Sequence, residues 1–154
     1  MKDQLLETWR IHCRVGHYVL EAMAPEALAA KGPKGRTIAA QLVHIHNVRR
    51  MWLASAEPAL ANGVDKLDPA TATAAEKATL AAALHASDAA IGQLIDHAVD
   101  AGKVKGFKPH PVAFVGYLIA HESFHRGDMG VRLTEAGFPL DRRTDFGMWE
   151  WGVR

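Results

Sequence analysis

The stretch PVAFVGYLIAHESFHRGDMGVRLTE, residues 111–135, carries the strongest helix signal in this chain. Apolar side chains recur at every helical turn, and no proline interrupts the stretch after its first position. Pro111 suits the first turn of a helix, and Gly137 suits a position just beyond the last turn. We therefore predict a helix that is apolar nearly all round and packs against neighbours on several sides.

Two histidines in this stretch predict a metal site. His121 and His125 are four residues apart, so in a helix both imidazoles leave the same face one turn apart and can bind one ion. Asp128 falls within about 20° of His121 around the helix axis, whereas Glu122 points about 100° away. Asp128 is therefore the better candidate for a base or a hydrogen-bonding support of the site, and Glu122 is the second candidate.

A third candidate ligand lies on an earlier helix. We predict that this helix begins at an N-cap, Thr37, and ends at about residue 57. His44 falls inside the apolar arc of that helix, between Val48 and Met51, whereas His46 falls at the border of the arc. Alone, His44 reads as a core histidine. Because three unpaired polar groups in one core would each cost desolvation energy, a shared purpose for the three histidines is favoured.

The rest of the chain predicts an all-α four-helix bundle. A first helix covers residues 2–24, and Pro25 opens a short extra piece. A long crossover, residues 58–72, precedes a third helix that a Thr73–Glu76 capping box starts and Gly102 ends. Residues 138–154 form an irregular tail that we expect to pack a tryptophan over a bundle end or a partner chain. The tail tryptophans are Trp149 and Trp151.

Composition narrows the function classes. The 154 residues fit one domain, residues 1–154, and the net charge of +1 comes from interspersed charges with no basic patch for nucleic acid. Cys13 is the only cysteine and cannot form an intramolecular disulfide, and no apolar run is long enough to span a membrane. We expect a cytoplasmic protein that binds neither nucleic acid nor membrane. The other helix histidines are expected to be structural or surface residues: His12, His17, His85 and His97.

Two motifs together resemble a known family. Residues 42–45 (LVHI) with Trp52, and residues 121–127 (HESFHRG), are similar to the motifs of the DinB-like bundle proteins, which include bacillithiol transferases and mycothiol-dependent maleylpyruvate isomerases. The resemblance implies a four-helix bundle with a long crossover before the third helix, often a homodimer. It implies a zinc or nickel site at His44, His121 and His125. It also implies transfer of a low-molecular-weight thiol to a small electrophile.

Two alternatives remain open. HESFH matches the H-E-x-x-H signature of zinc hydrolases, with Glu122 as base, although the downstream histidine of one such class falls at Val131 and no strand pattern accompanies the motif. Alternatively, the histidines are hydrogen-bonded core residues of a non-enzymatic helical association or stress protein. Metal content separates the alternatives, because only a true site loses its ion when a histidine is removed and the fold persists.

Overall fold

The computed structural model describes residues 1–32, 35–71 and 76–154. Within these ranges the chain is helical and has no strand, apart from an isolated bridge between Val104 and Phe107. The elements are α1 (Lys2–Ala22), the 3-10 helix η1 (Pro25–Ala29), α2 (Ile38–Ala56), α3 (Pro58–Ala61), α4 (Lys77–Ala101), α5 (Pro111–Glu135) and α6 (Arg142–Gly147). None of the described helices is both long enough and apolar enough to cross a membrane.

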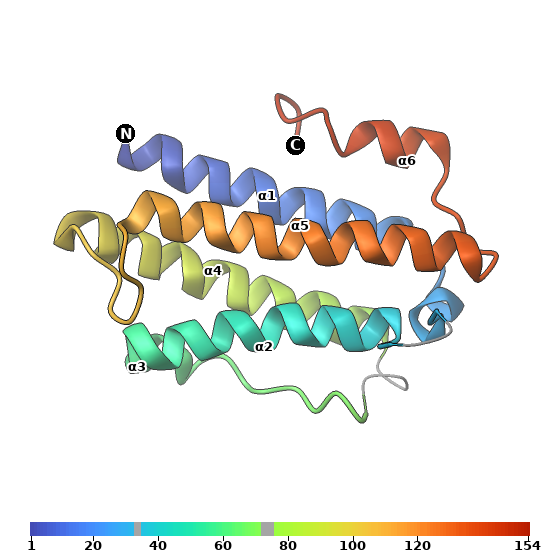
Figure 1. Ribbon diagram of the computed structural model, residues 1–154, viewed down its shortest axis with the longest axis horizontal. Coiled ribbons are helices and arrows are strands. Elements are labelled where there is room, and N and C mark those ends of the chain that lie inside the picture. The colour runs from blue at the N-terminus through green and yellow to red at the C-terminus, as the bar shows by residue number, and fades with distance from the viewer. Residues whose placement is uncertain (33–34, 72–75) are drawn as a thin grey trace.

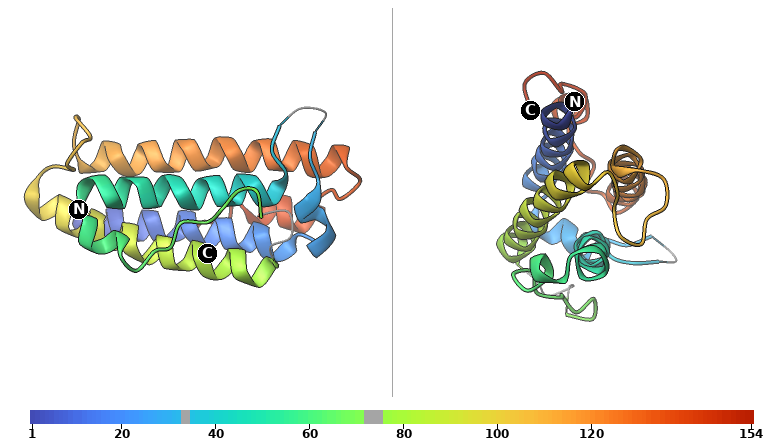
Figure 2. Two further views of the ribbon diagram at one scale, coloured as in Figure 1. Left: turned by 90° about the horizontal axis from the view of Figure 1, so that it is seen from below. Right: turned by 90° about the vertical axis from the view of Figure 1, so that its left-hand side faces the viewer.

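The four long helices α1, α2, α4 and α5 form the bundle (Figure 1). Seen from its end, α1 and α2 lie on opposite corners, and each packs against both α4 and α5 (Figure 2). α2 and α4 run in the same direction, as do α1 and α5. Two consecutive parallel helices require the chain to travel back along the bundle, which explains the long crossover between α2 and α4.

The helix ends follow the signals in the sequence. The Thr37 hydroxyl accepts a hydrogen bond from the Ala40 N–H (3.1 Å) and caps α2. Gly102 adopts a left-handed conformation (φ 70°) directly after α4, where a residue with a Cβ would be strained. His110 caps α5 by accepting from the Ala113 N–H through its Nδ1 (3.1 Å). The capping box predicted to start the third helix includes Thr73, which lies outside the described residues.

The tail is more regular than its sequence suggests, because residues 142–147 form α6, which lies beside α1 (Figure 1). The tail is anchored at Tyr18, whose hydroxyl donates to the Arg143 carbonyl (3.3 Å) and whose ring lies under the Arg154 guanidinium (3.8 Å to the ring centroid). Trp149 and Trp151 remain 79% and 41% exposed. Neither tryptophan is buried over an end of this bundle, and packing of one of them against a partner chain stays a prediction.

The interior consists of two apolar clusters with a polar layer between them. One cluster gathers Leu20, Ile38 and Leu133 with their neighbours, and the other gathers Trp9 and Phe114 with theirs. Each long helix contributes one buried polar residue to this layer, at a position between or beside the residues of the two clusters: His12, Arg49, Ser87 and Glu122. A charged layer in the middle of a bundle requires internal partners, because each charge has lost its contact with water.

Two sequence expectations about burial need correction. α5 is not apolar and buried all round, because Val112, Phe124 and Val131 are 47%, 71% and 58% exposed. In α2, Met51 is 52% exposed, and the buried face instead contains Arg49. His44 is consequently half-buried at the border of the packed face, not enclosed in the core as predicted.

Candidate metal centre

Three histidines converge between α2 and α5. His44 comes from α2, and His121 and His125 come from successive turns of α5. The ring centroids of His44 lie 5.3 Å and 4.8 Å from those of His121 and His125, and the latter two are 4.7 Å apart. One ring nitrogen from each residue lies within 4.8 Å of the other two. This three-histidine cluster can therefore bind a single metal ion.

The electrostatics of the cluster favour neutral imidazoles. Partial burial lowers the pKa of all three histidines. For His44, Arg36 and the neighbouring imidazoles add to this effect and bring the pKa to about 4. The histidines are thus in the form that binds a metal at neutral pH.

His121 also has a buried ring nitrogen that needs a partner. Its Nδ1 is inaccessible to water and finds no hydrogen-bond partner among the described residues. A buried polar atom without a partner is destabilising, and a metal ligand bond or a bound water would satisfy it. The donor set, three neutral imidazoles, suits zinc or nickel.

A chain of polar side chains supports His125. Its Nδ1 lies 3.4 Å from Gln41 Oε1, and Gln41 Nε2 donates to Asp128 Oδ2 (2.8 Å). Arg132 donates to the same oxygen (2.6 Å), and this contact, with that from Gln41, lowers the pKa of Asp128. If His125 donates from Nδ1, its Nε2 keeps the lone pair that a metal needs.

Asp128 lies beside the cluster, and Gln41 links it to His125, while its role as a base or support stays a prediction. Gln41 itself was missed by the sequence analysis. It precedes His44 by three residues, so the two share a face of α2, and it is 2% exposed. That spacing, together with a buried amide in an apolar helix, is the signal that could have found it.

Glu122 has a different role. Arg49 donates to both of its carboxylate oxygens (2.6 Å each), and His12 Nε2 donates to Oε2 (2.8 Å). Burial opposes its ionisation, but Arg49 and His12 overcome this effect and lower the pKa of Glu122 to about 2. Burial lowers the pKa of His12, which is then neutral and accepts from Arg126 at Nδ1 (3.2 Å). Glu122 is a permanently ionised partner of Arg49.

This arrangement disfavours the hydrolase interpretation of HESFH. The general base of such a site must have an oxygen free to take a proton. Both oxygens of Glu122 are held by Arg49 and His12, and a carboxylate with a pKa of about 2 is a weak base. The described residues also form no strand that could hold an extended peptide.

His46 lies away from the cluster. It is 1% exposed, and its Nε2 is bonded to the carbonyl of Asp65 (2.7 Å) in the crossover. This contact attaches the crossover to α2. The wheel prediction reversed the two residues, since His46 is buried and His44 is half-buried.

A surface cleft of about 230 Å³ opens beside His125. It is lined by Arg36, Gln41, Phe124, His125, Asp128 and Arg132. Two arginines face one carboxylate across this cleft, and Asp128 is already bonded to Arg132. Arg36, which is exposed, makes the cleft suitable for a small anion.

Fold and cluster together define an all-helical bundle with a possible site for one divalent metal between its second and last long helices. A family model described as the DinB family matches residues 1–141. Because the match covers most of the chain, this protein belongs to the DinB family, and the family resemblance expected from the two motifs is confirmed. The match stops just before α6. Comparisons with curated proteins and with solved structures gave no match.

Proposed function

We propose that this protein is a metal-dependent transferase that joins a low-molecular-weight thiol to a small electrophile. The observation that supports the proposal best is the convergence of His44, His121 and His125 within 4.8 Å of one another, with no carboxylate among them. Three neutral ligands leave the full charge of a bound zinc or nickel ion uncompensated and leave a position open for substrate. A metal held by these residues would lower the pKa of a bound thiol, so that the thiol would be available as its thiolate at neutral pH.

The protein residues have separate roles in this proposal. His44, His121 and His125 hold the metal ion. Gln41 fixes the ring orientation of His125, and Asp128 fixes Gln41. Arg36 binds an anionic group of the thiol or of the electrophile. This contact holds the substrate in the surface cleft beside His125.

Metal analysis tests the site. The wild type and His121→Ala are loaded with zinc or nickel and dialysed exhaustively. The metal content of His121→Ala should then be lower than that of the wild type by one equivalent per chain, while circular dichroism shows unchanged helicity. His97→Ala is the matched control, because His97 is an exposed histidine outside the cluster. Equal metal content in all three proteins would contradict the assignment.

Thiol chemistry requires a second test. The loaded protein is mixed with a panel of thiols and electrophiles, and conjugate formation is followed by mass spectrometry. We expect conjugation that His121→Ala abolishes and Arg36→Ala weakens mainly for anionic substrates. Metal binding without conjugation of any pair would refute the transferase and leave a metal-binding protein.

The proposal extends to location and assembly. Reduced low-molecular-weight thiols are maintained in the cytoplasm, so we propose that the protein acts there. We also propose a homodimer, in keeping with the exposed apolar side chains of the tail, Phe146 (60%), Trp149 (79%) and Val153 (76%). Sedimentation analysis should give twice the 16.8 kDa chain mass. A monomer at all concentrations would refute the dimer without affecting the metal site.

A further inference from the structure

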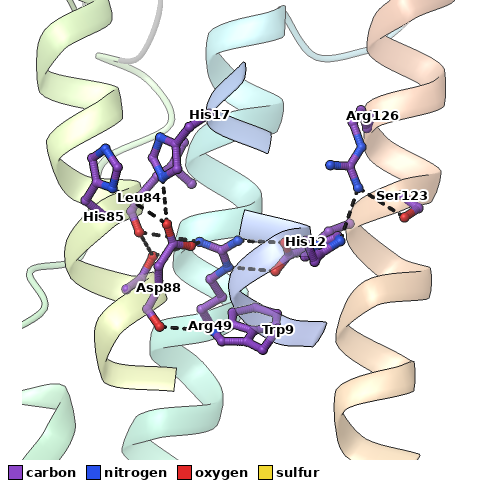
Figure 3. A network of polar contacts seen from close by, with 11 residues as sticks. Trp9, His12, His17, Arg49, Leu84, His85, Asp88, Ser123 and Arg126 are labelled. Atoms are coloured by element: carbon purple, nitrogen blue, oxygen red, sulfur yellow. Dashed lines mark hydrogen bonds and ion pairs between the residues drawn. The ribbon is translucent and has the colours of Figure 1, made fainter. Parts of the chain in front are cut away.

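A second cluster of potential ligands lies on the opposite side of the buried polar layer, where α1 meets α4. His17 comes from α1, and His85 and Asp88 come from α4, one turn apart. His17 Nε2 is 2.6 Å from Asp88 Oδ2, and His85 Nδ1 is 4.0 Å from the same oxygen. One ligand atom from each residue lies within 4.8 Å of the other two. Figure 3 shows the two imidazoles beside the Asp88 carboxylate.

The two imidazoles lie face to face. The ring centroids of His17 and His85 are 3.5 Å apart, and the ring planes differ by only 7°. The hydrogen bond between His17 and Asp88 does not require His85 at this position. His85 therefore supplies a second ring nitrogen beside an oxygen that is already bonded to the first.

The buried layer holds Asp88 in place. Arg49 Nη1 donates to Asp88 Oδ1, and its Nε and Nη2 donate to Glu122 (Figure 3). The Trp9 indole N–H donates to the Asp88 main-chain carbonyl (3.0 Å) and fixes the backbone beside it. Burial opposes ionisation of Asp88, but Arg49 and His17 overcome it, and the pKa is below its usual value. Asp88 is therefore a charged ligand whose Oδ2 faces the histidines.

The cluster is accessible to an ion from solvent. The side chain of His85 is 67% exposed, whereas those of His17 and Asp88 are 12% and 13% exposed. All three residues line a cleft of about 570 Å³ between α1 and α4. An ion entering this cleft thus meets one exposed ligand, His85, and two largely buried ligands, His17 and Asp88.

We propose that His17, His85 and Asp88 form a second metal site, which binds a divalent transition metal. Two imidazole nitrogens and one carboxylate oxygen are the donor set of many open zinc and iron sites, and imidazole also binds copper. The metal replaces the proton that His17 shares with Asp88, so binding releases that proton to solvent. This site shares no ligand with the three-histidine cluster and does not depend on thiol chemistry.

The test removes the three-histidine cluster first. In the variant His121→Ala/His125→Ala, titration calorimetry with zinc and electron paramagnetic resonance with copper should each detect one equivalent per chain, with nitrogen ligands in the copper spectrum. Adding His85→Ala should weaken binding by more than the 10–100-fold typical of lost supporting contacts. His85 is the residue to change, because an exposed side chain is removed with little effect on folding, whereas Asp88 pairs with buried Arg49.

A matched control separates a built site from adventitious binding. His97 lines the same cleft and pairs with Glu57 (3.0 Å) outside the His17–His85–Asp88 cluster, so His97→Ala in the same background should leave the affinity unchanged. The proposal is overturned if the variant that lacks His121 and His125 binds neither zinc nor copper. It is also overturned if His85→Ala has no effect or if His97→Ala has the same effect. None of these outcomes affects the three-histidine cluster, whose failure is detected separately with His121→Ala.

Discussion

The two histidine clusters of this bundle are built from the same kind of side chain in different ways. The three-histidine cluster lies between α2 and α5 and contains only neutral nitrogen donors. The His17–His85–Asp88 cluster lies between α1 and α4 and includes a carboxylate held by a buried guanidinium. A bound dication keeps its charge of +2 in the first and is reduced to +1 in the second. The first therefore suits an anionic substrate, and the second suits retention of the ion.

Both clusters are next to one buried side chain. Arg49 bonds Asp88 on one side (Figure 3) and Glu122 on the other. Glu122 directly follows His121 in the chain. Arg49 is 4% exposed, and its ring contact with Trp9 (5.1 Å to the centroid) fills its remaining face. The two clusters thus differ in the charge of their ligands, while Arg49 is a neighbour that both share.

Removing the shared support should have the largest effect. Arg49→Ala removes the guanidinium from the buried carboxylates of Glu122 and Asp88 and leaves His12 and His17 beside them. Breaking a buried ion pair in this way costs about 3–5 kcal/mol. We expect this loss in the free energy of unfolding by urea denaturation, with weaker metal binding at both clusters. The neighbouring Arg50→Ala, which removes one hydrogen bond to the Val64 carbonyl, should cost about 1 kcal/mol. Similar values for the two variants would contradict the central role of Arg49.

The next effect should separate the clusters. Gln41→Ala removes the contact that orients His125 and should weaken metal binding at the three-histidine cluster about 10–100-fold, while the His17–His85–Asp88 cluster is unaffected. Competition with a chelating dye measures the affinity of the three-histidine cluster in a His85→Ala background and that of the His17–His85–Asp88 cluster in a His121→Ala/His125→Ala background. Asp128→Asn should act in the same direction but less strongly, because Gln41 stays in place. Equal weakening at both clusters would show that Gln41 acts through folding.

The smallest effect concerns a histidine–carboxylate pair that lacks a third ligand. Glu57 raises the pKa of His97, so this pair stabilises the fold fully below the ordinary histidine pKa of 6.5. The stabilisation is lost as the pH rises through the raised pKa of His97. His97→Gln should therefore lower the Tm slightly at pH 5.5 and leave it unchanged at pH 9. A Tm difference that is larger at pH 9 would contradict this sign.

Most of the fold could be predicted, because local signals determine where helices begin and end. Thr37, Gly102 and Pro111 mark boundaries through hydrogen bonding, backbone freedom and a fixed φ, and none of these depends on the rest of the chain. The burial of Arg49 could not be predicted in this way. It belongs to a pair of arginines in the sequence, and only the approach of Glu122 and Asp88 from other helices makes its burial stable.

The candidate sites likewise differ in how much of each can be predicted from local signals. His121 and His125 are one turn apart in one helix, so their spacing alone brings them together. His44 was added from an apolar arc whose centre was misjudged, because Arg49 occupies the buried face and displaces His44 to its border. The sequence does not predict the approach of His17 and His85, since no spacing within one helix relates residues on α1 and α4. Contacts between helices depend on how the helices pack against one another, and the periodicity of a single helix does not predict this packing.

The single cysteine gives the protein a chemical inertness that suits its proposed substrates. Cys13 is 7% exposed, and burial, with the nearby Asp88 carboxylate, raises the pKa of its thiol. Nucleophilic attack and disulfide exchange both require the thiolate, so this sulfur neither consumes an electrophile nor forms a mixed disulfide with a small thiol. In the folded protein it should resist alkylation, and it should become reactive only on unfolding. In the proposed thiol transfer, the protein's own thiol therefore stays out of the reaction.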